Sequence, residues 1–275
     1  MDTVAQALIM GIVQGLTEFL PVSSSGHLII VPFLLGWHDP FITSLAFSVM
    51  LHIGTLAALL IYFWAEWLRL VPAGLAAVRD RSFRDDPNRR LAWLLVASTV
   101  PAAIAGFLLN DLMESRVREV GLVALTLVIG GLILWLADRR GGQSKGVDDV
   151  SFPLAIGIGV AQALALVPGI SRSGISISAA RFAGLNREAA ARFSFLMAAP
   201  VTAGAAIFEV RKLVGGELGV AVSAAPLLVG VVAAFLSGIV AIGVLLRYVR
   251  TRSLNVFVAY RLALAAVVLV VWLAR

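Results

Sequence analysis

A short polar stretch near the start of the chain brings together residue types that nucleophilic and acid–base catalysis use. Residues 19–30 read FLPVSSSGHLII, and the polar stretch comprises Glu18, Ser23, Ser24, Ser25, Gly26 and His27. A hydroxyl, an imidazole and a carboxylate this close in sequence can supply a nucleophile and a proton acceptor. The alternatives are structural, because serines also cap helices and an acid or a histidine can pair with a neighbouring helix.

Gln14 precedes Glu18 by one helical turn, so the two side chains would share a helix face. Their oxygens could point at one divalent cation, Mg²⁺ or Ca²⁺, or at an attacking water. One carboxylate and one amide make a weak metal site, which phosphate oxygens of a substrate would have to complete. Glu18 is therefore the expected metal ligand.

A second stretch, PGISRSGIS at 168–176, repeats the arrangement and adds a cation. Serines can cap the helices that follow both stretches, and the free backbone N–H groups of such helix ends bind anions. Arg172 has apolar neighbours on both sides and needs an anion, and its planar guanidinium suits phosphate. The alternative is a structural pair with Glu18. The expected substrate-binding residues are Gln14, Ser23, Ser25, Gly26, Ser171, Ser173, Gly174 and Ser176.

The two stretches belong to an internal repeat. QGLTEFLPVSSSGH at 14–27 and QALALVPGISRSGI at 162–175 share Q-x-L, then proline, then S-x-S-G in the same order. A second, shorter match follows in each half, where Phe47-Ser48 corresponds to Phe193-Ser194. The pattern predicts two related halves, residues 1–140 and 150–275.

The rest of the chain is apolar enough for a membrane. Of its 275 residues 60% are hydrophobic and 14% are charged, and the mean hydropathy is +0.96, far above that of soluble domains. The absence of cysteine excludes disulfides, thiolate catalysis and cysteine-bound metals. A net charge of +6 is typical of basic loops that face anionic lipid, not of nucleic-acid binding. We therefore expect a multi-pass membrane protein with lipid, and no nucleic acid, as its partner.

Six apolar segments approach or exceed the roughly 20 residues that a helix needs to cross the hydrocarbon core. They are 43–68, 91–110, 119–137, 188–208, 225–246 and 255–273. Two further segments, 3–36 and 153–187, are interrupted by proline, serine and glycine. The apolar run LIIVPFLLGW after His27 would reach only about 15 Å as a helix, half of the core thickness. We therefore expect both segments to be re-entrant helical hairpins.

Each half then contains one hairpin and three crossing helices. Because three is odd, the second half must be inverted relative to the first. The expected fold is an all-α integral membrane protein, one membrane domain over 1–275, with an inverted-topology repeat whose hairpins meet near the midplane. His52, in the middle of the first span, could line the resulting cavity.

Lys and Arg predict the orientation of this arrangement. In the expected topology the segments 69–90, 139–145 and 247–252 lie on the face opposite the termini, and they carry most of the basic loop residues. The positive-inside rule then predicts that both termini are outside. If both interrupted segments crossed the membrane instead, the difference in Lys and Arg between the two faces would be unchanged. The charges therefore do not test whether these segments are hairpins.

Together the motifs resemble those of the undecaprenyl-diphosphate phosphatase family, bacterial membrane enzymes linked with bacitracin resistance. That family carries an acid or glutamine four residues before a glutamate, and a P-G-x-S-R-S-x-x-T motif. The resemblance places the first pair on Gln14 and Glu18, the family's important serine and histidine on Ser24 and His27, and its essential arginine on Arg172. It covers essentially the whole chain.

Two positions depart from the family pattern. Gln14 stands where many members have Glu, which weakens any metal site, and Ser176 replaces the final threonine but keeps the hydroxyl. The resemblance implies the same inverted-repeat fold in the bacterial inner membrane. It also implies hydrolysis of a polyprenyl diphosphate lipid, undecaprenyl diphosphate, to undecaprenyl phosphate and inorganic phosphate. This reaction recycles the lipid carrier of peptidoglycan synthesis and so serves cell wall biogenesis, cell shape and antibiotic resistance.

The expected catalytic residues are Glu18, Ser24, His27 and Arg172. We expect Ser24 to attack phosphorus with His27 as its base; the alternatives are attack by His27 itself or by water activated by Glu18 or its cation. The competing class is a transporter or flippase of a phosphorylated lipid or other anion, because inverted repeats and broken helices are typical of transporters. Monomer and homodimer both stay open.

Overall fold

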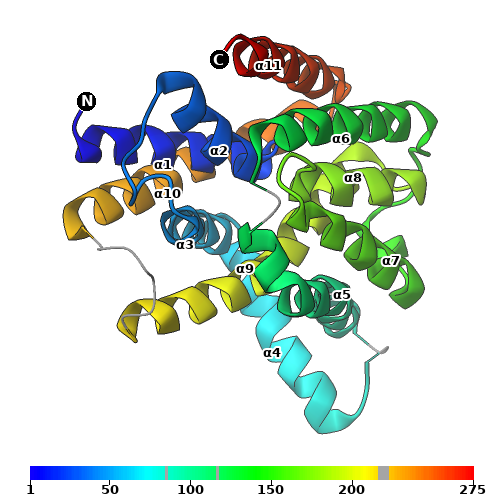
Figure 1. Cartoon of the computed structure of the whole chain (residues 1–275). Helices are drawn as coiled ribbons and strands as arrows, with labels where there is room; N and C mark the ends of the chain where they lie inside the picture. Colours follow the sequence, from blue (N-terminus) through cyan, green and yellow to red (C-terminus); the bar gives the residue numbers. More distant parts are fainter. Residues whose placement is uncertain (84–85, 116–117, 216–222) are drawn as a thin grey trace.

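The computed structural model describes residues 1–83, 86–115, 118–215 and 223–275 (Figure 1). The described chain is helical, and its α-helices are α1 (Thr3–Phe19), α2 (Ser24–Leu35), α3 (Leu45–Tyr62), α4 (Trp64–Asp80), α5 (Pro87–Ser115), α6 (Val120–Arg140), α7 (Phe152–Ala163), α8 (Arg172–Phe182), α9 (Arg187–Val214), α10 (Ala224–Val249) and α11 (Asn255–Ala274). Two short 3₁₀ helices, η1 (Val147–Asp149) and η2 (Leu164–Leu166), flank α7.

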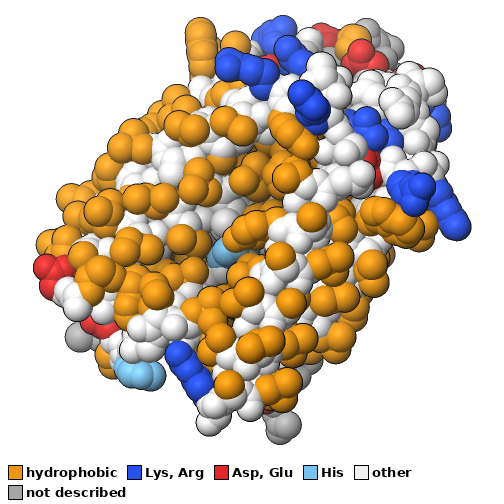
Figure 2. Space-filling model, turned by 90° about the horizontal axis from the view of Figure 1, so that it is seen from above, with side chains coloured by type: hydrophobic (Ala, Val, Ile, Leu, Met, Phe, Trp, Pro, Cys, Tyr) orange, Lys and Arg blue, Asp and Glu red, His pale blue; other side chains and the backbone are white. Residues whose placement is uncertain are grey.

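Six of the described helices are long and apolar enough to cross a membrane: α3, α6, α10, α11 and the first parts of α5 and α9. They correspond to the six predicted spans, although the first span ends earlier than predicted, so a multi-pass helical membrane protein is confirmed. Figure 2 shows hydrophobic side chains over most of one face, with Lys and Arg gathered toward one end. This distribution is typical of a membrane protein whose lipid-facing surface is apolar.

The first predicted span, 43–68, is wrong at its C-terminal end. Helix α3 ends at Tyr62, because Phe63 leaves the helical region with φ −101° and ψ 27°, and α4 begins at Trp64. Helix α4 is amphipathic and packs against α5, burying Leu70 and Ala77. Neither glycine nor proline marks the break, so the apolar run shows no sign of it in the sequence.

The helical pair α1–α2 begins and ends at the same end of the molecule. The Thr3 hydroxyl donates to Oδ2 of Asp39 at 2.7 Å, which joins the start of α1 to the loop after α2. Arg275 donates to the carbonyl of Phe33 at 2.6 Å, which brings the end of α11 to the end of α2. Both chain termini therefore lie at this end, and they are close together in Figure 1.

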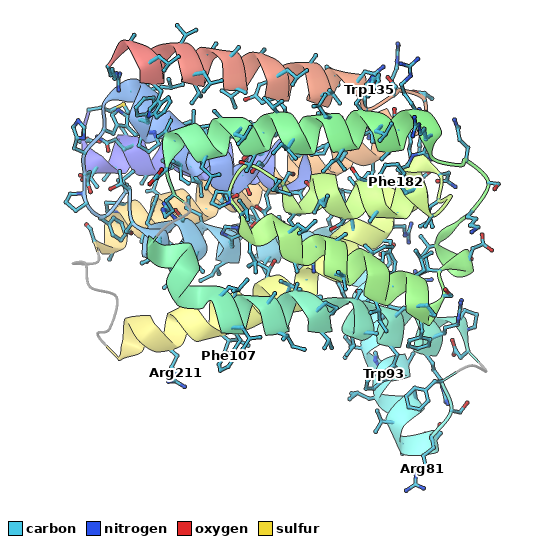
Figure 3. The ribbon with its side chains drawn as sticks, turned by 45° about the vertical axis from the view of Figure 1, so that its right-hand side comes forward. Arg81, Trp93, Phe107, Trp135, Phe182 and Arg211 are labelled. Atoms are coloured by element: carbon cyan, nitrogen blue, oxygen red, sulfur yellow. The ribbon has the colours of Figure 1, made fainter. Side chains whose placement is uncertain are left out.

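The pair α7–α8 begins and ends at the opposite end. The backbone N–H of Lys145, before α7, donates to the carbonyl of Gly184, after α8, at 3.2 Å. Asp138 near the end of α6 accepts from Arg187 at 2.6 Å, at the start of α9. Figure 3 shows Trp135 and Phe182 at this end and Arg211 at the other. The two helical pairs therefore enter the molecule from opposite ends.

The tips of the two pairs meet in the interior. Ser23 and Ser171 occupy equivalent places, each with a positive φ (75° and 77°), and each accepts a hydrogen bond from the backbone N–H of a glycine, Gly26 and Gly174 respectively. The Ser23 hydroxyl also accepts from the backbone N–H of Gly169 at 3.1 Å, which ties one tip to the other. The serines thus cap helices, as the structural alternative predicted, and join the tips.

Arg261 of α11 clamps this junction. Its side chain is completely buried, and its guanidinium donates to the carbonyls of Leu127 at 3.0 Å, Pro21 at 3.3 Å and Gly169 at 2.7 Å. These carbonyls belong to α6 and to both tips. The clamp satisfies backbone groups that would otherwise be buried without partners, a cost of about 1–3 kcal/mol for each one.

We expect Arg261→Met to lower the apparent melting temperature in detergent by at least about 5 °C, because it removes these bonds while keeping the apolar stem. Scanning fluorimetry of the purified variant provides the measurement. Arg252→Met, at an exposed position beyond α10, is the control. A melting temperature equal to that of the wild type would show that Arg261 does not hold the tips together.

Candidate functional site

A cavity of about 200 Å³ lies where the hairpin tips meet, between α3, α5 and α9. Its polar lining residues are Glu18, Ser24, Ser25, His52, Gln162, Ser171, Arg172 and Thr202. The structure thus brings together Glu18 from α1, Ser24 from α2 and Arg172 from α8. Apolar residues such as Val49 and Val201 complete the wall.

Glu18 is the centre of the polar network. It is only 5% exposed, so its charge depends on nearby donors. Its Oε1 accepts a hydrogen bond from the guanidinium of Arg172. Its Oε2 accepts from the hydroxyl of Ser24 and, at 3.0 Å, from Nε2 of Gln14. The Nε2 atom of His52 lies 3.5 Å from the same oxygen.

Ser24 is the first residue of α2, and its hydroxyl points at the Glu18 carboxylate. A carboxylate bonded in this way can accept the hydroxyl proton while the oxygen attacks an electrophile. Ser25 also lines the cavity, at the N-terminal turn of α2, where free backbone N–H groups favour anions. The geometry supports a nucleophile, its base and an anion site within one cavity.

Arg172 is the first residue of α8 and is held from two sides. Besides Glu18, its guanidinium donates to the hydroxyl of Thr202 at 2.5 Å and to the carbonyl of Ala198 at 3.2 Å, both in α9. Its side chain is 19% exposed and lines the cavity. A planar guanidinium fixed in this way presents fixed donors to a phosphate group.

Several expected binding residues do not line the cavity and are bonded within or between the two helical pairs instead, namely Ser23, Gly26, Ser173, Gly174 and Ser176. The Ser173 hydroxyl donates to the carbonyl of Leu20 at 3.0 Å, and the Ser176 hydroxyl donates to the carbonyl of Arg172 at 2.8 Å. The backbone N–H of Gly174 donates to the capping Ser171, which itself lines the cavity. Substrate binding by these five residues stays a prediction.

His27 lies in a different environment from the one its sequence position suggested. Its Nδ1 is 2.7 Å from the carbonyl of Ser23, so it carries the proton, and its Nε2 accepts from the hydroxyl of Tyr260 at 2.7 Å. The two rings are stacked with centroids 5.6 Å apart. Both ring nitrogens are therefore occupied, and His27 is not among the residues that line the cavity. The placement does not support His27 as the base for Ser24.

Three further cavity residues were not among the predicted catalytic or binding residues, namely His52, Gln162 and Thr202. His52 lines the cavity, as predicted, and its Nδ1 donates to the carbonyl of Ser48 at 2.7 Å, which leaves Nε2 toward Glu18. The available sequence signal was a histidine in the middle of an apolar span. Thr202 had no signal, and Gln162 had only its place in the repeat.

The cavity does not contain a preformed divalent cation site. Among the described residues, Glu18 is the single carboxylate in its lining, and both of its oxygens already accept hydrogen bonds. Oε1 of Gln14 has no partner among the described residues, but one amide oxygen is a weak ligand set. The described residues also hold no group of three or more His, Asp or Glu side chains suited to a metal. The described residues alone therefore do not form a complete ligand set, and the cation with Glu18 as its ligand stays a prediction.

The fold and this site define a class: polytopic helical membrane proteins with a buried polar site built from two broken helical segments. A family model described as Bacitracin resistance protein BacA matches residues 7–267, and the chain belongs to this family. Curated relatives cover the same length. The chain is 47% identical over 266 residues to a protein named undecaprenyl-diphosphatase from Gemmatimonas aurantiaca, which covers 97% of each chain.

Two further relatives carry the same name. The protein from Desulforudis audaxviator is 44% identical over 270 residues, covering 98% of each chain. The protein from Moorella thermoacetica is 44% identical over 274 residues, which is 99% of this chain and 100% of the relative. The family predicted from the motifs is therefore confirmed over essentially the whole chain.

Proposed function

We propose that this protein hydrolyses undecaprenyl diphosphate to undecaprenyl phosphate and inorganic phosphate in the bacterial inner membrane. The observation that carries the proposal is the Ser24 hydroxyl bonded to the Glu18 carboxylate, which is in turn paired with Arg172 inside one cavity. The names of the relatives supply the substrate. As the family name implies, recycling this lipid also confers bacitracin resistance.

In the proposed mechanism Oγ of Ser24 attacks the terminal phosphorus, and Glu18 takes the hydroxyl proton. The bond from that phosphorus to the bridging oxygen breaks, and undecaprenyl phosphate leaves while a phosphoserine remains. Water then cleaves the phosphoserine and releases inorganic phosphate. Arg172 stabilises the charge on the transferred group, because its guanidinium is already fixed beside the attacking oxygen. Any divalent cation that takes part would be bound by the oxygens of the diphosphate and would enter the site with the substrate.

An apolar groove supports a lipid-linked substrate. A cavity of about 510 Å³ between α3, α4, α5 and α9 is lined almost entirely by apolar side chains. A small cavity of about 10 Å³ lies between it and the polar site, and it shares Arg172 and Thr202 with the site and Leu56 and Ala199 with the groove. The proposed occupant of the groove is the prenyl tail of the substrate, whose diphosphate lies in the polar site.

The proposed fold is the inverted repeat, with 1–140 and 150–275 as its halves and 3–36 and 153–187 as re-entrant hairpins. In its support, α1 packs along α10 as α7 packs along α5. Gly11 and Gly159 make the equivalent close approaches, since an added Cβ would lie 2.8 Å from Cβ of Ala233 in α10 and 3.1 Å from Cα of Ser98 in α5, respectively. In each of the helical pairs α1–α2 and α7–α8, the second helix ends at the same end of the molecule at which the first helix begins.

The proposed orientation has both termini outside and the basic loops in the cytoplasm. The chain lacks cysteine, so single cysteines can be introduced without background. A cysteine at Ser82, between α4 and α5, should resist an impermeant thiol reagent in intact cells, whereas one at Trp37, after α2, should react. The reverse pattern would overturn the orientation.

The decisive experiment for the function is phosphate release by the purified protein in detergent, without a membrane gradient. We expect release from undecaprenyl diphosphate and, because the tail contributes binding, slower release from farnesyl diphosphate. A flippase or transporter of a phosphorylated lipid would release no phosphate from either lipid. Titration with EDTA and then Mg²⁺ or Ca²⁺ would show whether the substrate must carry a cation.

We expect Arg172→Lys to lower kcat/KM by about 30- to 150-fold, or about 2–3 kcal/mol. Lysine keeps the charge but cannot contact Glu18, Thr202 and a phosphate through one planar group. Arg250→Lys is a matched control, because Arg250 pairs with Glu188 at 2.7 Å on the exposed surface. Near-normal turnover of Arg172→Lys would mean that Arg172 contributes only a diffuse positive field.

A further inference from the structure

Gln162 is a buried amide with no hydrogen-bond partner in the part of the chain that the structure describes. It is 3% exposed, it lies near the end of α7, and neither its Nε2 nor its Oε1 has a partner among the described residues. Its side chain lines the polar cavity together with Ser171 and Arg172. Leaving a buried amide unpaired costs folding energy, so such a group is retained where a ligand or water completes its bonds.

The repeat explains why this amide is free. Gln14 occupies the corresponding place in the first hairpin, and its Nε2 donates to Glu18 at 3.0 Å. In the second hairpin the position that corresponds to Glu18 is Leu166, which offers no side-chain acceptor. The two halves thus use the same glutamine differently. Gln14 orients the Glu18 carboxylate, whereas Gln162 keeps its amide donors toward the cavity.

We propose that Gln162 binds substrate, its Nε2 donating a hydrogen bond to a non-bridging oxygen of the diphosphate. The proposal rests on the proposed function and deepens it. The neighbouring groups in the cavity wall, Ser171, Arg172 and Ser25, are donors, and Glu18 is the single acid that the described residues contribute to the lining. A site with this balance takes an anion, and a neutral amide adds a donor without the desolvation cost of another buried charge.

Substituting Gln162 separates a binding role from a structural one. We expect Gln162→Leu to raise KM for undecaprenyl diphosphate at least about 10-fold with little change in kcat, since a hydrogen bond to an anion in the ground state is lost. Its melting temperature should equal or exceed that of the wild type, because a buried unpaired group is removed. Gln162→Glu should raise KM further, because it places a carboxylate against the diphosphate.

Gln6→Leu in α1 is the matched control. Gln6 is also buried, with an unpaired Oε1 among the described residues, but it lies outside the cavity lining. This variant should keep the wild-type KM. An unchanged KM in Gln162→Leu, or a lowered melting temperature, would overturn the inference.

Binding of methylenediphosphonate, which cannot be hydrolysed, keeps this test independent of turnover. Calorimetry should show at least about 10-fold weaker binding to Gln162→Leu than to the wild type. If the wild type hydrolyses the lipid and Gln162→Leu matches it in both assays, the inference fails and the proposed function stands. If the wild type binds the analogue but does not hydrolyse undecaprenyl diphosphate, the proposed function fails. The difference in analogue affinity between the wild type and Gln162→Leu then still decides whether Gln162 binds the diphosphate. Absence of binding to the wild type would overturn the inference.

Discussion

Ser24→Ala is expected to reduce kcat for phosphate release by about 10³-fold or more, the largest effect of any single substitution at the site. Alanine removes the attacking oxygen and leaves Glu18 with its bonds to Arg172 and Gln14. Residual turnover would come from water in the emptied position. The measurement is phosphate release under saturating lipid in detergent.

The control for this substitution is Ser178→Ala. Ser178 is also a buried serine of a hairpin helix, and its hydroxyl donates to the carbonyl of Gly174 at 2.7 Å, outside the cavity lining. It should turn over substrate like the wild type. If Ser24→Ala retained more than about a tenth of the wild-type rate, Ser24 would be a phosphate-binding residue and not the nucleophile.

Rapid quenching during turnover tests the same assignment by a different observable. Attack by Ser24 leaves an acid-stable phosphoserine, whereas attack by His27 leaves an acid-labile phosphohistidine, and both would be found on the peptide that carries residues 23–27. We expect phosphoserine, since His27 is bonded at both ring nitrogens. Phosphohistidine would reverse the assignment, and the absence of any adduct would point to direct attack by water.

Glu18→Gln is expected to lower kcat at least about 100-fold while the protein still folds. Glutamine has nearly the same shape, but its single amide oxygen can accept either from Arg172 or from Ser24 and Gln14, and it cannot accept the serine proton. It also loses the charge that opposes Arg172. The measurement is again phosphate release, with the melting temperature recorded for each sample.

Glu66→Gln provides a matched control. Glu66 also pairs with an arginine, Arg192, at 2.6 Å, but it lies in α4, away from the residues that line the cavity. It should retain wild-type turnover. If Glu18→Gln also retained near-normal turnover, the carboxylate would be a structural partner of Arg172, as the alternative interpretation of the sequence holds.

The sequence by itself determined the class of protein and the segments that build it. Crossing a membrane depends on the length and apolarity of a local segment, so six spans and two interrupted segments could be recognised without tertiary information. The repeated Pro-Ser-Gly motifs likewise marked the segments at which the helical pairs α1–α2 and α7–α8 meet. Glu18, Ser24 and Arg172 were predicted because a charge or hydroxyl in an apolar segment needs a partner, and the structure places these three together.

Only the tertiary structure decided which side chains share the cavity, because that depends on how each helix is rotated against its neighbours. Ser24 and His27 lie one turn apart on α2, yet the first contacts α1 and the second contacts Tyr260 of α11. His52 faces Glu18 because α3 packs against α1. Thr202 fixes Arg172 from the following helix, α9, 30 residues further along the chain. Nothing in the sequence of one segment indicates which residue of another segment it will contact, so periodicity and motif spacing do not predict these contacts.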